Sequence, residues 1–184
     1  MSRIPPLESE KVNAKSRDLL GDAKQQLGKV PNILKTMAHS EATLGAYMGM
    51  SCALSKSSLS AELQEKISLA LSQRNECDYC VAAHTSIAKS MGVDDVALAT
   101  VREGEGQTTR EDAAIQLALA VQDTRGFVSD NEIVQANESG ITDAEICDIV
   151  TLVAKNIFAN YFSHVAQTDI DFEEADWLDQ MAVG

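Results

Sequence analysis

The sequence is poor in aromatic residues, in proline and in basic residues. Aromatic residues make up 4% of the 184 positions, and the three prolines all lie at or before position 31. Lys and Arg number 15 against 28 Asp and Glu, which gives a formal net charge of −13. Because so acidic a surface repels phosphate groups, we expect no nucleic-acid partner. No apolar run approaches the roughly 20 residues of a spanning helix, and no apolar signal core opens the chain, so we expect a cytoplasmic protein without a membrane partner.

The absence of proline after Pro31 favours helix through the rest of the chain. Proline fixes φ and removes a backbone donor, whereas Ala, Leu, Glu and Gln are good helix formers. No stretch alternates β-branched and polar residues for long enough to predict a strand. Apolar residues make up 45% of the chain, which is enough to build one core. The sequence therefore predicts a single all-α domain over residues 1–184.

Helix start and stop signals divide this domain into elements. They are capping boxes beginning at Ser129 and Thr142, N-caps at Ser60 and Thr109, and helix-ending glycines at Gly92, Gly126 and Gly140. The predicted helices span residues 9–27, 32–38, 41–55, 61–75, 77–91, 94–103, 110–125, 130–138 and 143–167. Residues 103–107, with two glycines, are expected to form an exposed loop.

The last predicted helix carries apolar residues at steps of three and four from Ile146 to Val165. Such a stripe suits the core, with part of it free for a subunit contact. Residues 169–184 form an acidic tail, expected to be solvated, although its Phe172, Trp177 and Leu178 could dock on a neighbouring subunit. The excess of apolar surface predicts a closed homo-oligomer: a dimer, trimer or hexamer.

The four cysteines fall into two classes. Cys52 and Cys147 are isolated among apolar neighbours, and free cysteine is among the most buried residue types, so we expect both in the core. Cys77 and Cys80 form a C-x-x-C, which in a reducing compartment indicates redox chemistry or a metal rather than a structural disulfide framework.

On a helix, Cys77, Cys80 and His84 share one face with apolar residues and point toward the interior, whereas Tyr79 and Thr85 lie off that face. Cysteines at i and i+3 can form a disulfide across one turn. His84 lies four residues after Cys80, within reach of its thiol. Glu65, in the middle of the preceding predicted helix, is placed to orient the imidazole and raise its basicity.

The residues alone leave the nucleophile and the kind of site open. A helix N-terminus favours a thiolate on Cys77, whereas the spacing from His84 favours Cys80. Plain core packing is an alternative explanation of two buried cysteines and a histidine on one helix face. Zinc is a further alternative, with Cys77, Cys80, His84 and Glu65 as four ligands, although structural zinc pairs usually straddle a turn.

The pattern from Glu65 through Cys77-x-x-Cys80 to His84 resembles the E-x11-C-x-x-C-x-x-x-H signature of the AhpD-like alkyl hydroperoxidases, in the carboxymuconolactone decarboxylase superfamily. The resemblance continues outside the signature and covers about residues 29–172. The flanking matches are Val30-Pro31-Asn32, Ala38-His39-Ser40 and the segment from Asn156 to Ala166, which are similar to the peroxidase-related branch.

The resemblance implies an AhpD-like helical bundle, a homo-oligomer and a cysteine peroxidase cycle that serves antioxidant defence. It makes Cys80 the attacking thiol and Cys77 the resolving thiol, with Glu65 and His84 as the relay that takes the proton from Cys80. The partners it implies are a peroxide and a reductant, either a dithiol protein or a small thiol. It implies no cofactor and no metal.

The chain departs from the best-known members at Tyr79, where they have a histidine, and we expect this tyrosine to pack with its hydroxyl satisfied. His39 and His164 are expected as core or helix-end histidines, with His164 nearer the edge of the site. The alternatives are a thiol–disulfide oxidoreductase or a non-enzymatic, redox-responsive binding or assembly protein. Lactone decarboxylation is less favoured because that branch does not depend on this cysteine pair.

Overall fold

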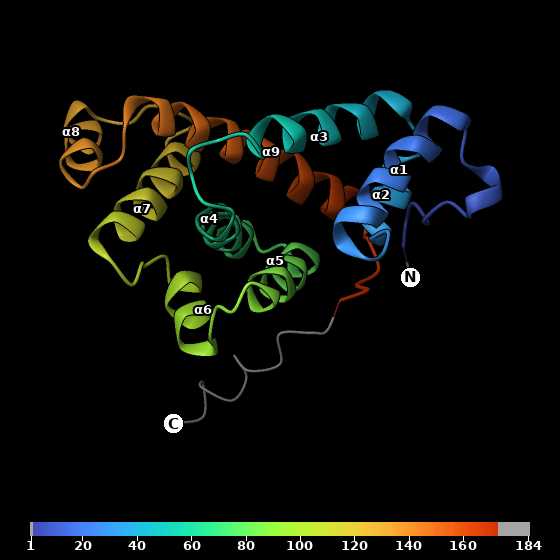
Figure 1. Ribbon diagram of the computed structural model, residues 1–184, viewed down its shortest axis with the longest axis horizontal. Coiled ribbons are helices and arrows are strands. Elements are labelled where there is room, and N and C mark those ends of the chain that lie inside the picture. The colour runs from blue at the N-terminus through green and yellow to red at the C-terminus, as the bar shows by residue number, and fades with distance from the viewer. Residues whose placement is uncertain (1, 173–184) are drawn as a thin grey trace.

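The computed structural model describes residues 2–172, and within them every regular element is a helix (Figure 1). A 3-10 turn at Ser9–Lys11 precedes α1 (Ala14–Leu27), α2 (Asn32–Met37), α3 (Glu41–Leu54), α4 (Ala61–Arg74), α5 (Asp78–Ser90), α6 (Asp95–Arg102), α7 (Thr109–Asp123), α8 (Asp130–Glu138) and α9 (Asp143–Ala166). The all-α prediction is confirmed. Within the same residues no helix is long and apolar enough to cross a membrane. Most of the acidic tail, with Trp177 and Leu178, lies outside the described residues.

Helix α4 is the centre of the packing, since α5, α6, α7 and α9 all contact it (Figure 1). Helix α3 lies along α9, and α1 and α2 pack against α3. The largest apolar cluster surrounds α4 and α7 and includes Ile67 and Ile115. A second cluster, which includes Met37 and Leu44, joins α2 and α3 to the start of α5. Cys77, Tyr79 and Cys80 belong to this second cluster.

Most of the helix boundaries agree with the sequence signals. Both capping boxes are present, and Gly92, Gly126 and Gly140 have positive φ as helix-ending glycines do. The helix predicted over 9–27 is wrong at its start: Asn13 accepts a hydrogen bond from the Ser16 backbone and begins α1 only at Ala14. The N-cap of α7 is Thr108 rather than Thr109, because the Thr108 hydroxyl accepts from the Glu111 N–H.

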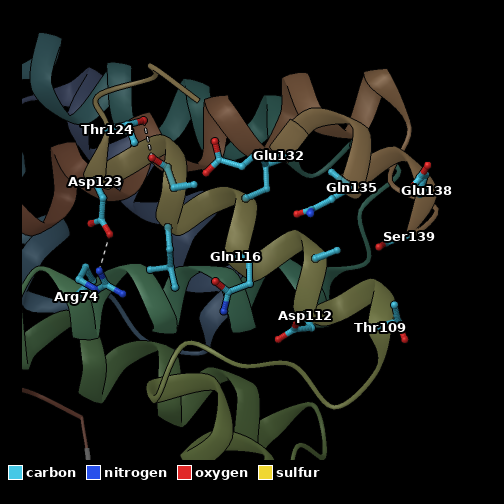
Figure 2. Close-up of a pocket in the computed structure, with 15 residues that line it drawn as sticks. Arg74, Thr109, Asp112, Gln116, Asp123, Thr124, Glu132, Gln135, Glu138 and Ser139 are labelled. Carbon is cyan, nitrogen blue, oxygen red and sulfur yellow. Dashed lines mark hydrogen bonds and ion pairs between the residues drawn. The ribbon is translucent and has the colours of Figure 1, made fainter. Parts of the chain in front are cut away.

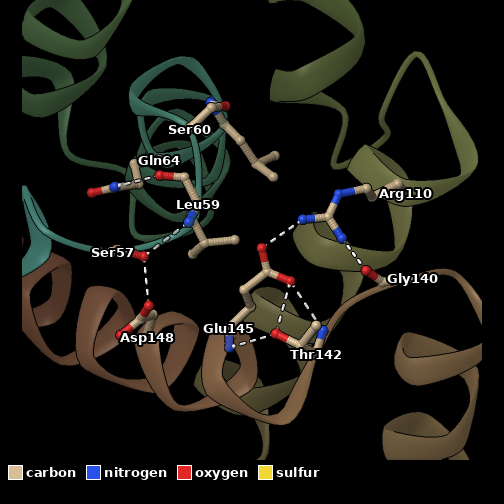
Figure 3. Close-up of polar contacts among 10 residues, drawn as sticks. Ser57, Leu59, Ser60, Gln64, Arg110, Gly140, Thr142, Glu145 and Asp148 are labelled. Atoms are coloured by element: carbon tan, nitrogen blue, oxygen red, sulfur yellow. Dashed lines mark hydrogen bonds and ion pairs between the residues drawn. The ribbon is translucent and has the colours of Figure 1, made fainter.

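Polar contacts hold the first two turns of α9 against α7 and, through Asp148 and Ser57, against the loop before α4 (Figure 3). The Glu145 carboxylate, 4% exposed, accepts from the backbone and hydroxyl of Thr142 and from Arg110 Nη2 at 2.6 Å. Arg110 also donates to the Gly140 carbonyl. In the middle of α9, Asn156 donates to the Ser68 hydroxyl of α4 at 3.1 Å. The Asn156 bond fixes α9 against the helix that carries Glu65, and the Glu145 contacts fix its start against α7.

Two predictions of burial are wrong. Cys52 and Cys147 are exposed in this chain, because each lies on the outer side of its helix, α3 and α9 respectively, rather than on the side that meets the core. The apolar residues of α9 are also not all buried, because they spread over more than one face of the helix. Its Ile149 and Val153 are buried, whereas Val150, Tyr161 and Val165 are about half exposed.

Candidate active site

The turn between α4 and α5 places the C-x-x-C at the start of a helix. Glu76 adopts positive φ, and the next N–H, that of Cys77, donates to the Ser72 carbonyl at 3.0 Å. Cys77 is the N-cap of α5 and Cys80 its third residue, so both thiols lie in the first turn. The helix N-terminus therefore favours a thiolate on either cysteine and does not distinguish them. The structure joins the two in a disulfide, with Cα atoms 5.3 Å apart.

The structure brings Glu65 and His84 together, as their spacing predicts. The Oε2 atom of Glu65 lies 2.6 Å from Nδ1 of His84, and the two side chains are 18% and 13% exposed. Burial acts to raise the pKa of the Glu65 carboxyl, but attraction and hydrogen bonding to His84, with a smaller effect of Lys155, hold that pKa below its usual value. Glu65 is therefore an ionised partner that fixes one imidazole nitrogen and leaves Nε2 free of Glu65.

Cys80 and this pair open on the same cavity of about 220 Å³. The cavity lies between α3, α4, α5 and α9, and α2 and Phe172 close another side. Its apolar lining includes Leu34, Met48, Ile87 and Ala159. A mostly apolar cavity with a few convergent polar groups is the usual form of a small-molecule site. Cys77 does not line it.

Lys155 is a residue of this cavity that the sequence analysis did not identify. It reaches the cavity from α9, and its ammonium lies over the Tyr47 ring, 5.4 Å from the centroid. The signal was a single lysine in the middle of an otherwise apolar helical stripe. A cation that shares a cavity with Cys80 stabilises its thiolate.

Tyr79 is buried and lines the cavity, although the helical count placed it off the Cys80 face. The count failed because α5 is covered on several sides, and Thr85, expected on the outer face, is also buried. Burial raises the pKa of the Tyr79 hydroxyl far above its usual value, and Asp171 adds to the effect. The protonated hydroxyl donates to Asp171 Oδ1 at 2.9 Å and accepts from the Ile33 N–H.

Residues just after α9 cover this side of the cavity. Oδ2 of Asp171 accepts from the N–H of Asn32 at the start of α2, 3.1 Å away. The Phe172 ring packs edge-on against Tyr79, with centroids 5.8 Å apart, and the Lys29 ammonium lies over the Phe172 ring, 3.8 Å from its centroid. In this chain Phe172 thus packs within its own molecule, whereas the sequence suggested a contact with a neighbouring subunit.

The remaining histidines lie outside the cavity. His39 is exposed, and its Nε2 lies 2.9 Å from the Pro5 carbonyl. His164 is exposed and stacks on Tyr161, and its Nε2 lies 3.3 Å from the Glu76 carbonyl on the Cys77 side of α5. Within residues 2–172 no group of three or more His, Cys, Asp and Glu side chains is placed to hold a metal ion.

A larger hollow, about 720 Å³, lies between α7, α8 and the end of α4 (Figure 2). Acidic and amide side chains such as Asp112, Gln116 and Glu132 line it, and its Arg74 pairs with Asp123 at 2.5 Å. It contains no cysteine or histidine. Because size alone supplies no reacting group, the smaller cavity at Cys80 is the candidate active site.

The family comparison matches the part of the chain that carries the candidate site. Residues 41–123, which include α3 to α7 with Glu65, both cysteines and His84, match the sequence model of the carboxymuconolactone decarboxylase family. Over these residues the chain is similar to that family. A search of curated protein sequences found no match.

Solved structures share the AhpD-like fold over almost the whole chain. An alkylhydroperoxidase AhpD core, a peroxidase-related protein from Ralstonia eutropha JMP134, is 24% identical over 92% of both chains, with a TM-score of 0.84. A peroxidase-related protein from Silicibacter sp. TM1040 is 19% identical over 95% of both, with a TM-score of 0.81. The debrominase Bmp8, as its C82A variant with 2,3,4-tribromopyrrole, is 18% identical over 98% of both, with a TM-score of 0.79. Of these three, Bmp8 is named for an activity, whereas the other two are uncharacterized peroxidase-related proteins.

Proposed function

We propose that this protein is a cysteine-based hydroperoxidase that reduces small, largely apolar hydroperoxides. One observation carries the proposal: Cys80 shares an apolar cavity with the hydrogen-bonded Glu65–His84 pair and lies within disulfide reach of Cys77. A nucleophile, a base and a group that orients the base are the arrangement that activates a thiol. The peroxidase-related proteins of the same fold support this choice.

In the oxidative half of the cycle the Cys80 thiolate attacks the outer oxygen of ROOH. The O–O bond breaks, Cys80 becomes a sulfenic acid, and the leaving alkoxide takes the proton that His84 removed from the thiol. Glu65 acts through His84 and is a positioning residue. Lys155 stabilises the negative charge in the cavity before and after transfer.

In the second half Cys77 resolves the sulfenic acid. Its sulfur attacks the Cys80 sulfur, the S–S bond forms, and the hydroxyl leaves as water after taking the Cys77 proton. A dithiol then reduces the disulfide and is itself oxidised. The net reaction converts one hydroperoxide and one dithiol into an alcohol, water and a disulfide.

The redox pair is tested by counting thiols and mapping oxidation states. We expect one equivalent of cumene hydroperoxide to lower the titratable thiols of the reduced protein from four to two, because Cys52 and Cys147 remain free. Cys77→Ser should accumulate a sulfenic acid at Cys80, detected by dimedone labelling and mass spectrometry. Cys52→Ser is the matched control and should lose two thiols as the unsubstituted protein does. An unchanged thiol count after excess peroxide would contradict the proposal.

Reaction rates with different substrates separate the alternatives. A thiol–disulfide oxidoreductase would exchange with disulfides at a rate well above its reaction with peroxide, and a redox-responsive binding protein would oxidise without turnover. Bmp8 is a debrominase with the same fold and was seen with 2,3,4-tribromopyrrole. Release of bromide from that compound, at a rate above peroxide turnover, would replace the hydroperoxidase assignment with dehalogenation.

We also propose that the protein works as a closed homo-oligomer. Val150, Tyr161 and Val165 leave apolar surface exposed on α9, and the chain carries a net charge of −13. Symmetric association would cover that surface. Sedimentation velocity at micromolar concentration should give a mass of two, three or six chains. A Tyr161→Lys variant should shift the distribution toward one chain, and a single-chain mass for the unsubstituted protein would reject the proposal.

A further inference from the structure

The Cys77–Cys80 disulfide lies between two separate hollows. Cys80 lines the active-site cavity described above, whereas Cys77 lines a second hollow of about 460 Å³ between the start of α5 and the end of α9. Tyr79 alone lines both. The disulfide and the Tyr79 ring therefore form the wall that separates them.

The two hollows differ in chemistry. The Cys80 cavity is mostly apolar and holds the Glu65–His84 pair with Lys155. The Cys77 hollow is lined mostly by polar side chains, among them Glu76, Asp78 and His164. Its wall also contains Thr168, which is 8% exposed and whose hydroxyl has no hydrogen-bond partner among the described residues. An unpaired buried hydroxyl is costly, and a bound ligand would satisfy it.

We propose that the reducing thiol reaches the disulfide through the Cys77 hollow and attacks the Cys77 sulfur, while peroxide reaches Cys80 through the other cavity. This rests on the proposed hydroperoxidase cycle. Two carboxylates, Glu76 and Asp78, face one imidazole, His164, in the lining of the hollow, which favours an uncharged dithiol over an anionic thiol as the reductant. Oxidant and reductant then occupy different hollows and need not displace each other.

The bond changes favour this direction of attack. A thiolate of the dithiol bonds to the Cys77 sulfur, the S–S bond breaks, and the electron pair leaves on Cys80. A better-stabilised thiolate leaves faster, and Cys80 leaves into the cavity that holds Lys155 and His84. The second thiol of the reductant then attacks its own sulfur in the mixed disulfide and releases Cys77. The two protons of the dithiol end on the two protein thiols.

Two cavity-filling variants test the proposal. Ile170→Trp fills the Cys77 hollow from a residue that is 38% exposed, and Met48→Trp fills the Cys80 cavity from α3. Each protein is first oxidised with diamide, so reduction by dithiothreitol is measured whether or not the protein turns over peroxide. Free thiols are counted by acid quench, alkylation and intact mass, and circular dichroism checks the fold.

We expect Ile170→Trp to slow reduction about tenfold and to leave oxidation by cumene hydroperoxide unchanged. We expect Met48→Trp to slow oxidation by cumene hydroperoxide and to leave reduction unchanged. In the unsubstituted protein, a brief pulse of 2-mercaptoethanol should leave its adduct on Cys77 and a free, alkylated Cys80. The proposal would be overturned if Met48→Trp slowed reduction and Ile170→Trp did not. It would also be overturned if the 2-mercaptoethanol adduct formed on Cys80. Either result would leave the hydroperoxidase proposal standing, since that depends only on oxidation.

Discussion

His84→Gln is expected to slow the oxidation of Cys80 by cumene hydroperoxide by about 10²–10⁴-fold, the usual cost of removing a positioned base. Glutamine keeps the size and polarity of the side chain but cannot take the thiol proton. Glu65→Gln should cost less, because Glu65 acts through His84 at 2.6 Å rather than on the substrate. Stopped-flow oxidation of the reduced protein, followed by thiol loss, measures both.

The pH profile distinguishes positioning from a merely structural role of Glu65. Without the carboxylate the imidazole loses its fixed orientation, so in Glu65→Gln the rate should fall across the whole pH profile while the circular dichroism stays unchanged. His39→Gln is the matched control, because His39 is exposed, lies outside the cavity and has its Nε2 against the Pro5 carbonyl. Full activity and an unmoved profile in both site variants would show that the pair is not a relay.

Glu145→Gln is expected to lower the free energy of unfolding by about 2 kcal/mol at pH 7, the order of a hydrogen bond to a buried charge. The Thr142 N–H holds the pKa of Glu145 below its usual 4.5, and Arg110 adds to this against the opposing effect of burial. A depressed pKa means that the stabilisation is complete above the unfolded pKa and is lost as pH falls through the folded one. The difference between the two proteins in urea unfolding should therefore shrink from pH 7 to pH 3.

Glu132→Gln provides the matched control for this prediction. Glu132 completes the same kind of capping box, at α8, but the side chain is on the surface and is not paired with an arginine in that box. Its substitution should cost less than that of Glu145. Equal losses would mean that the cap, and not the buried Arg110 contact, accounts for the effect.

The sequence predicted the helices well because their signals are local. The capping boxes at Ser129 and Thr142 need only residues three positions apart, and both form. Burial was predicted less well because it depends on which helices meet. The same periodicity that indicated one apolar stripe on α9 gave no sign that Tyr161 and Val165 would face outward, or that Cys147 would be exposed.

The candidate site shows the same division. The spacing of Glu65, Cys80 and His84 in the sequence predicted that they lie close together on two neighbouring helices. In the structure all three line one cavity. Lys155 and Phe172 come from segments far along the chain, and only the packing of α9 and of the residues after it places them there. Tyr79 was misplaced because a helical wheel assumes one solvent-facing side, and α5 is covered on more than one.

The bond between Asp171 and Asn32 joins residues 139 positions apart, and their chain neighbours Phe172 and Ile33 form part of the wall of the Cys80 cavity. Contacts of such separation must close a very long loop, so they form late in folding. On the ribosome, the Cys77–Cys80 pair emerges well before residue 172. The newly made dithiol therefore spends part of its synthesis without the wall that later restricts access to it, and during that interval it is open to non-selective oxidation.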